Sequence, residues 1–293
     1  MERAQRSKLQ RKCCTVGKFE SFHRGHRRLI EKAKEVCDRV VVISIRGVVE
    51  EVFTDEERRE IARELGVELL DVPFSQIKDL SPLEFLQFLK GLGCSFLVVG
   101  SDWRFGRGRS GNVETARRLG RDLGIEVISV GIEREEGEKI STSRILDLLK
   151  SGDLKAANSL LGFPYFSFGL VVKGEGRGRE LGFPTINVVP DKRLPLPFGV
   201  YAVRIEVDGR KYLGIANYGR APTLKNGEPL VEIHVPKGEI PDFTGKRVKV
   251  EFLEFFRPEK RFNSVEELIE QIKLDLKYFE EFRRSRGGRG EEV

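Results

Sequence analysis

The hydrophobic pattern in the first half of the chain alternates between strand-like and helix-like segments. Short apolar runs of this kind are typical of strands, and they occur at residues 13–17, 39–45, 68–72, 95–100 and 125–131. Between them, residues 24–36 place Leu29, Ile30, Ala33 and Val36 on one face of a helix. Strands separated by helices predict βαβ units and an α/β, doubly wound domain with a parallel sheet.

Two further helices are predicted from their first residues. Thr54 and Glu57 have the spacing of a capping box, in which each side chain binds the backbone N–H of the other. Ser81 precedes Pro82, and proline is favoured at the first position of a helix.

The pattern changes after residue 164. Short β-branched and aromatic runs follow one another with Gly, Pro and Asp-Gly turns between them, which predicts an antiparallel β-barrel. The predicted strands are residues 166–173, 185–189, 199–207, 211–217, 230–235 and 247–256. A closing helix is predicted over residues 264–283, with Leu268, Ile272 and Leu276 at helical spacing.

We therefore predict two domains, at residues 12–161 and 162–285. The basic start, residues 1–11, and the arginine- and glycine-rich end, residues 286–293, are expected to be disordered.

Composition narrows the class of protein. Hydrophobic residues make up 39% and charged residues 33% of the chain. No run reaches the roughly 18 apolar residues that a membrane-spanning helix needs, and the first residues do not have the pattern of a signal peptide. The net charge of +6 arises from 52 basic and 46 acidic residues that are interspersed. This mild excess suits nucleotide substrates as well as nucleic acid.

The cysteines predict a reducing compartment. Cys13, Cys14, Cys37 and Cys94 contain no Cys-x-x-Cys pair. We therefore expect neither a disulfide scaffold nor a zinc ribbon, and we expect a cytoplasmic protein. A single Met, few Asn and Gln, and many charged residues lean toward a thermophile.

The first candidate site follows the first predicted strand, in the sequence GKFESFHRGH at residues 17–26. Neither a Rossmann fingerprint nor a P-loop is present. His23 and His26 share one face at the start of a helix, and Gly25 between them lets a phosphate approach the backbone. Two imidazole donors there could stabilise charge on an α-phosphate under attack. Half of a metal site and a solvated basic helix start are the alternatives.

The second candidate site is the sequence KGEGRGRELGFPTIN at residues 173–187. A glycine-rich loop can wrap phosphates with its backbone N–H groups. The hydroxyl of Thr185 and the amide carbonyl of Asn187 are hard oxygen ligands that suit Mg²⁺.

These motifs resemble those of the bacterial bifunctional riboflavin kinase/FAD synthetase family. In the first half, His-x-Gly-His and the segment VGSDWRFGRGRSG at residues 99–111 resemble its adenylyltransferase module, which belongs to the nucleotidylyltransferase superfamily. The resemblance implies a second phosphate motif at residues 140–144, where an ordinary helix cap is the alternative. It implies that His23 and His26 are catalytic. The implied nucleotide-binding residues are Gly17, Phe19, Gly25, Ser141, Thr142, Ser143 and Arg144.

This half also departs from the family. Lys18, Glu20 and Ser21 differ from its usual residues, and Leu146 replaces a basic residue. The His-Pro pair expected after the second strand is missing.

The resemblance continues through residues 161–283. It implies that Glu232 is the catalytic base, that Thr185 and Asn187 bind the metal, and that Gly174, Gly176, Arg177, Gly178 and Arg179 bind nucleotide. Asn217, Arg257 and Glu259 are implied in flavin binding, although a surface pair is the alternative for the last two. Glu232 could otherwise be an exposed strand residue.

The implied reaction has two steps. Riboflavin is phosphorylated by MgATP to FMN, and FMN is then adenylylated by a second ATP to FAD with release of pyrophosphate. The implied partners are riboflavin, FMN, FAD and ATP, with Mg²⁺ and without nucleic acid or membrane, for a monomer or weak homo-oligomer.

The departures motivate one alternative, a riboflavin kinase whose first domain is not catalytic. A non-enzymatic RNA binder and a nucleotidylyltransferase for another acceptor are further alternatives.

Overall fold

The computed structural model describes residues 12–174, 176–220, 228–236 and 241–287. The chain forms two compact units, Met1–Arg144 and Ile145–Val293. The division falls inside helix α7 (Thr142–Ser151), whereas the boundary predicted from sequence lies at residue 161. The predicted disordered ends lie outside the described residues, except that α10 extends as far as Gly287.

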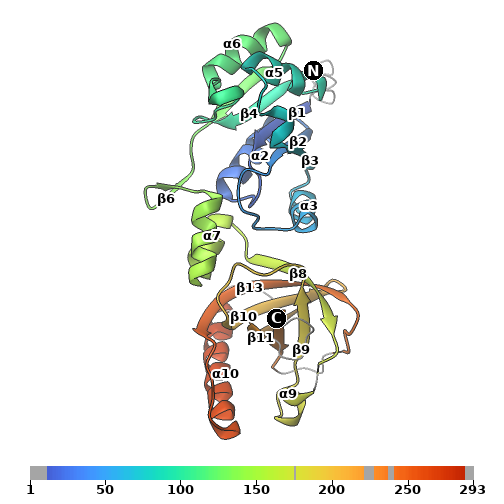
Figure 1. The fold of residues 1–293 in the computed structure, drawn as a ribbon, viewed down its shortest axis with the longest axis vertical. Helices are drawn as coiled ribbons and strands as arrows, with labels where there is room; N and C mark the ends of the chain where they lie inside the picture. Colours follow the sequence, from blue (N-terminus) through green and yellow to red (C-terminus); the bar gives the residue numbers. More distant parts are fainter. Residues whose placement is uncertain (1–11, 175, 221–227, 237–240, 288–293) are drawn as a thin grey trace. The chain divides into compact units, whose positions relative to one another are not determined.

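The first unit is built on a parallel sheet of five strands in the order β3-β2-β1-β4-β5 (Figure 1). The strands are β1 (Lys12–Gly17), β2 (Arg39–Arg46), β3 (Glu68–Pro73), β4 (Phe96–Gly100) and β5 (Glu126–Val130). The chain order reverses beside β1, which lies between β2 and β4. Ligands of such sheets bind at the carboxyl ends of the strands at this reversal.

Helices cover both faces of this sheet, as the sequence predicts. On one face α5 and α6 pack against Cys14, Val16 and Leu97, and on the other α2 packs against Cys13 and Val98. The helices of the unit are α2 (Arg24–Val36), α3 (Asp55–Glu64), α4 (Phe74–Ile77), α5 (Pro82–Gly91) and α6 (Val113–Leu123), with a 3₁₀ turn at Arg107–Arg109. Both predicted capping residues, Thr54 and Ser81, accept from the backbone as expected.

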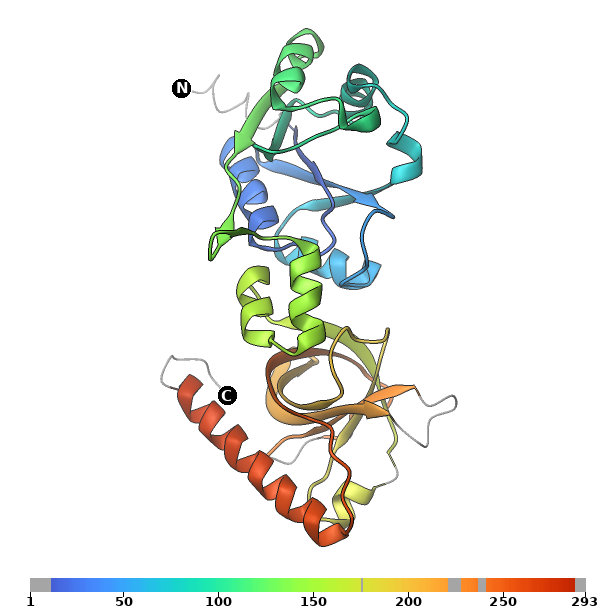
Figure 2. The ribbon, with the colours of Figure 1, turned by 60° about the vertical axis from the view of Figure 1, so that its left-hand side comes forward.

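The second unit is a closed antiparallel barrel in the order β10-β11-β12-β9-β8-β13. Its strands are β8 (Tyr165–Val172), β9 (Ile186–Pro190), β10 (Gly199–Val207), β11 (Arg210–Arg220), β12 (Pro229–His234) and β13 (Arg247–Pro258). Three further helices are α8 (Leu154–Leu161), α9 (Arg177–Glu180) and α10 (Val265–Gly287). Helix α10 lies along the barrel (Figure 2). Its residues Phe279 and Phe282 pack against Val200 and Leu253 of the barrel.

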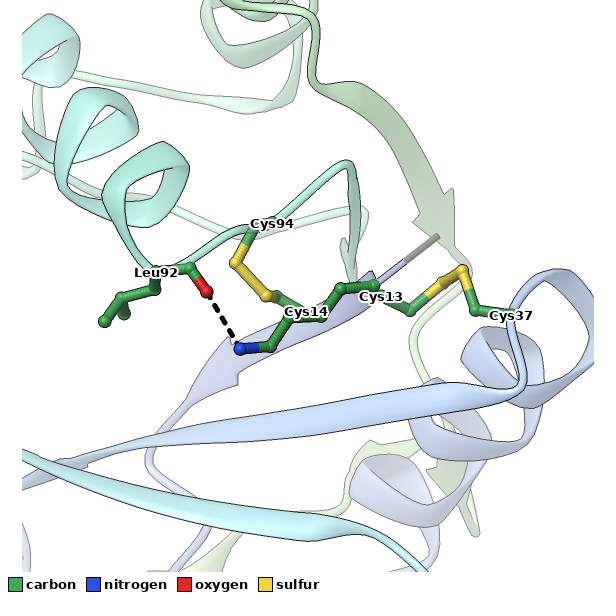
Figure 3. The surroundings of a disulfide bond; sticks show 6 residues. Cys13, Cys14, Cys37, Leu92 and Cys94 are labelled. Carbon is green, nitrogen blue, oxygen red and sulfur yellow. Dashed lines mark hydrogen bonds between the residues drawn. A yellow bond between two sulfur atoms is a disulfide. The ribbon is translucent and has the colours of Figure 1, made fainter. Parts of the chain in front are cut away.

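The cysteines correct the prediction from sequence. Cys13 is bonded to Cys37, and Cys14 is bonded to Cys94 (Figure 3). The prediction relied on sequence spacing, which does not show that one central strand can reach a partner on each side. Successive side chains of a strand point to opposite faces, so adjacent cysteines in β1 pair with different elements.

Candidate active sites

The loop after β1, the histidine loop, ends at His23, and His26 follows in the first turn of helix α2. Phe19 and Phe22 are fully buried, and Phe22 adopts a φ of 46°. His23 caps helix α2, because its Nδ1 accepts from the backbone N–H of His26 at 3.3 Å. The two imidazole rings stack at 3.7 Å between centroids, and Phe19 lies 4.4 Å from the ring of His26.

Both imidazoles are neutral near pH 7. Burial lowers the pKa of His23 to about 4, and it also lowers the pKa of His26, whose Nδ1 is enclosed. Since Nδ1 of His23 accepts a hydrogen bond, the neutral ring carries its proton on Nε2. His23 therefore presents an N–H donor without a positive charge.

The structure brings the two predicted phosphate motifs of this unit together. The hydroxyl groups of Ser21 and Thr142 are 3.0 Å apart and buried, although 121 positions separate them in sequence. Ser141 also caps α7, because its hydroxyl accepts from the N–H of Arg144 at 3.3 Å. Ser143 is exposed. The segment is thus both a helix cap and a neighbour of the histidine loop.

The side chain of Arg144 contacts a small hairpin. The strands β6 (Arg134–Glu135) and β7 (Glu138–Lys139) pair in antiparallel fashion. Arg144 donates to the backbone oxygen of Glu135 at 3.1 Å and forms ion pairs with Glu136 and Glu138. Leu146 is 4% exposed, so it is a core residue and offers no charge to the site.

Lys139 of this hairpin is a residue that the motif analysis missed. It is ion-paired with Asp102, which follows the end of β4. Burial of the imidazoles is the largest cause of their lowered pKa values, and the positive charge of Lys139 lowers both pKa values further. The only sequence feature that could have pointed to Lys139 is its position immediately before the motif at residues 140–144.

Glu20, which departs from the family's usual residue, faces an arginine at the end of β2 and another on α3. Glu20 is 3% exposed and is ion-paired with Arg46, at the end of β2. Arg58, which is fully buried, lies 4.0 Å from the same carboxylate and donates to the backbone oxygen of Phe19 at 3.4 Å. Burial raises the pKa of Glu20, while both arginines lower it. These contacts fix the histidine loop on a charged network that motif analysis did not predict.

The second unit aligns three predicted site residues across neighbouring strands. Glu232 on β12 is the register partner of Asn187 on β9 and of Asn217 on β11. Directly paired residues share a face of a sheet, so the carboxylate lies between the two amides. Thr185 is two positions before Asn187 and shares its face. The four residues line one cavity.

The glycine-rich loop lies directly against this row. A Cβ atom at Gly174 would stand 2.0 Å from Nδ2 of Asn187, and one at Gly178 would stand 2.5 Å from the backbone oxygen of Phe183. Only glycine allows this close approach. Gly176 also lines the cavity. Arg177 and Arg179 belong to α9, and their side chains lie outside the described residues.

The cavity has a volume of about 720 Å³ and continues to α10. Arg257 donates to both carboxylate oxygens of Asp275, at 2.8 and 2.6 Å, and Asp275 is 4% exposed. Glu259 also lines this cavity, and its Oε1 would stand 2.6 Å from a Cβ placed on Gly219. Arg257 thus pairs with the buried carboxylate of Asp275, whereas the predicted alternative was a surface pair with Glu259. No sequence motif marks Asp275.

The oxygen atoms of Thr185 and Asn187 suit a hard cation that takes few ligands from the protein. In the described part of the chain, no group of three or more His, Cys, Asp or Glu side chains is placed to hold a metal. A hydroxyl and an amide carbonyl on one strand face match Mg²⁺, which keeps several waters and binds substrate phosphates.

The parallel α/β unit and the closed barrel with its glycine-rich loop match two families of transferases, a nucleotidyltransferase family and a kinase family. The family model for FAD synthetase matches residues 5–144, and the model for riboflavin kinase matches residues 161–283.

Curated relatives match along both halves. The bifunctional riboflavin kinase/FMN adenylyltransferase of Listeria monocytogenes is 32% identical over 284 residues, covering 90% of each chain. The proteins of that name from Bacillus subtilis and Escherichia coli are 33% and 34% identical, covering 92% and 89% of this chain and 93% and 89% of theirs. The chain belongs to the bifunctional riboflavin kinase/FMN adenylyltransferase family. Both domains are present, which supports the two-activity interpretation and not the kinase alone.

A solved structure supports the fold over both units. A Streptococcus pneumoniae protein described as a macrolide-efflux protein matches with a TM-score of 0.81 and 29% identity, covering 92% of this chain and 94% of that chain. Within the described residues of the present chain, no helix is long and apolar enough to cross a membrane.

Proposed function

We propose that Glu232 is the general base of the kinase reaction in the second unit. It would accept the proton of the ribityl 5′-hydroxyl of riboflavin as that oxygen attacks the γ-phosphate of ATP. The observation that carries this assignment is the row of Asn187, Glu232 and Asn217, which faces one cavity beneath the glycine-rich loop. General-base assistance is worth about 10²- to 10⁴-fold in rate.

Thr185 and Asn187 would hold Mg²⁺, which neutralises charge on the transferring phosphates. The backbone N–H groups from Gly174 to Gly178 would hold the phosphates of ATP, aided by Arg177 and Arg179. Asn217, Arg257 and Glu259 would orient the flavin, with Arg257 fixed by Asp275.

In the first unit, a phosphate oxygen of FMN would attack the α-phosphate of ATP, and pyrophosphate would leave. His23 and His26 would donate hydrogen bonds to the oxygens on which charge develops, without a covalent enzyme intermediate. Gly17, Phe19 and Gly25 would shape the nucleotide site. Ser141, Thr142, Ser143 and Arg144 would contact its phosphates. The buried Ser21–Thr142 contact, which joins the two motifs, supports this arrangement.

We further infer a cytoplasmic enzyme that acts as a monomer or weak homo-oligomer, without nucleic acid or membrane partners. The interspersed charges support this inference.

A chromatographic time course tests the proposal. Purified protein with riboflavin, excess ATP and Mg²⁺ should accumulate FMN first and then convert it to FAD. FMN that accumulates without FAD would remove the adenylyltransferase role of the first unit. A complete reaction without Mg²⁺ would remove the metal-binding role of Thr185 and Asn187.

A further inference from the structure

Strand β1 is cross-linked on both sides of the sheet. Cys13 belongs to the core cluster that contains Ala33 and Cys37, and Cys14 belongs to the opposite cluster that contains Leu89 and Cys94. Figure 3 shows the two sulfur atoms leaving the strand in opposite directions. The Cα–Cα distances of 5.8 and 5.7 Å lie in the usual range for disulfides.

The two bonds attach β1 to two different connections of the fold. Cys37 is the C-terminal cap of α2, and Cys94 follows the turn that ends α5. Two hydrogen bonds reinforce the second attachment. Lys12 donates from Nζ to the backbone oxygen of Leu92 at 2.8 Å, and its own backbone oxygen accepts from Ser95 at 3.0 Å. The other end of β1 continues directly into the loop that ends at His23 and leads to His26 in the first turn of α2.

The cross-links are confined to one unit. The sequence contains four cysteines, all before residue 95, so the barrel unit has none. In the first unit every cysteine is bonded. All four side chains are at most 2% exposed, so a reductant reaches the sulfur atoms only when the unit opens.

We propose that the two disulfides form a redox-dependent clamp on β1, which stabilises the adenylyltransferase unit and leaves the kinase unit unaffected. Each bond forms when two thiols lose two protons and two electrons to a low-molecular-weight disulfide, which is reduced to two thiols. Cross-links that close loops of 24 and 80 residues restrict the unfolded chain, and the longer loop is restricted more. The clamp thus corrects the expectation of reduced thiols, and thermophile intracellular proteins are the known exception to that expectation.

The bonds themselves can be detected in the intact protein. Alkylation in denaturant without reductant should modify no cysteine, and alkylation after reduction should modify all four. Trypsin without reductant should release one species that joins residues 13–18, 35–39 and 91–104, because cleavage sites flank each cysteine. Four alkylated thiols before reduction would overturn the proposal.

The effect on stability is tested with a Cys37→Ala/Cys94→Ala double variant of the full chain. Calorimetry should show the unfolding transition of the first unit lowered by on the order of 10 °C, with the transition of the barrel unchanged. Heat inactivation of adenylylation, measured with supplied FMN, should shift by the same amount, while kinase inactivation should not. The matched control is wild-type protein that is reduced in denaturant and refolded with reductant. Its first unit should unfold at the same temperature as that of the variant.

Two results would contradict the clamp. One is an equal shift in the heat-inactivation temperature of both activities. The other is an oxidised wild type whose first unit unfolds at the same temperature as that of the double variant. Calorimetry measures unfolding and does not depend on enzyme activity. It therefore tests the stabilising role of the disulfides even if the proposed activity of the first unit is wrong. If the variant does not fold, the comparison of oxidised and reduced wild type decides the question.

Discussion

The two candidate sites are assembled in opposite ways. In the barrel, Asn187, Asn217 and Glu232 meet because antiparallel register places them side by side on adjacent strands. In the α/β unit, the site forms where loops from distant parts of the sequence meet, as the Ser21–Thr142 contact shows. A site formed by paired strands is held in place by the sheet itself. A site formed by loops needs additional contacts to fix its geometry. The buried ion pairs of Glu20 and the disulfides of β1 provide such contacts in the first unit.

The comparison predicts that the two activities can be lost separately. Glu232→Gln should lower the rate of FMN formation by about 10²- to 10⁴-fold, because the amide cannot accept the proton. Adenylylation of supplied FMN should be unchanged. The matched control is Glu254→Gln, on the exposed part of β13, which should keep both rates. Equal loss of both activities in Glu232→Gln would contradict its assignment to one site.

The reverse separation is expected from the first unit. His26→Ala should lower FAD formation from supplied FMN by about 10²- to 10³-fold, because a donor to the reacting phosphate is lost. FMN formation from riboflavin serves as the control on the same polypeptide and should be preserved. Unchanged FAD output would exclude His26 from the reaction.

Acid should destabilise the first unit through His23. Its pKa is about 4 in the folded protein, below the ordinary value of 6.5, so the unfolded chain binds the proton more readily. Stability from this group is complete above pH 6.5 and is lost as the pH falls toward 4, by about 3 kcal/mol in total. Calorimetry of His23→Gln between these pH values should show a correspondingly flatter pH dependence for the first unit. A slope identical to that of the wild type would contradict the burial effect.

The smallest expected effect concerns the orientation of Arg257. Asp275→Asn removes the bidentate partner of the guanidinium and should raise KM for riboflavin about tenfold, with kcat little changed. Steady-state kinetics of the kinase reaction measure both quantities. Glu270→Gln, at an exposed position of the same helix, is the control and should leave KM unchanged. A fall in kcat at constant KM would place Asp275 in the chemical step.

Local patterns predicted most of the fold. The helix at Arg24–Val36 and the strand at Gly199–Val207 have their predicted ends, because their periodicity and flanking turns are unambiguous. The parallel sheet and the closed barrel are both confirmed. The hairpin at residues 134–139 was not predicted, since a polar segment with strands of two residues has no hydrophobic period.

The missed residues share one physical reason. Arg46, Asp275 and Lys139 act through partners far away in sequence, and single-chain patterns do not encode such pairs. The expectation that the cysteines are not disulfide-bonded was wrong for the same reason, because the neighbours of β1 were unknown before the strand order was known.

The position of β1 between β2 and β4 has a consequence for synthesis on the ribosome. The strand emerges first, yet its second neighbour ends only at Gly100. At about 5–20 residues per second, roughly 4–17 s separate the synthesis of these two strands. During that interval one edge of β1, a strand with four consecutive buried residues in the folded unit, is uncovered. Chaperones that bind extended apolar segments have access to it before the second half of the chain exists.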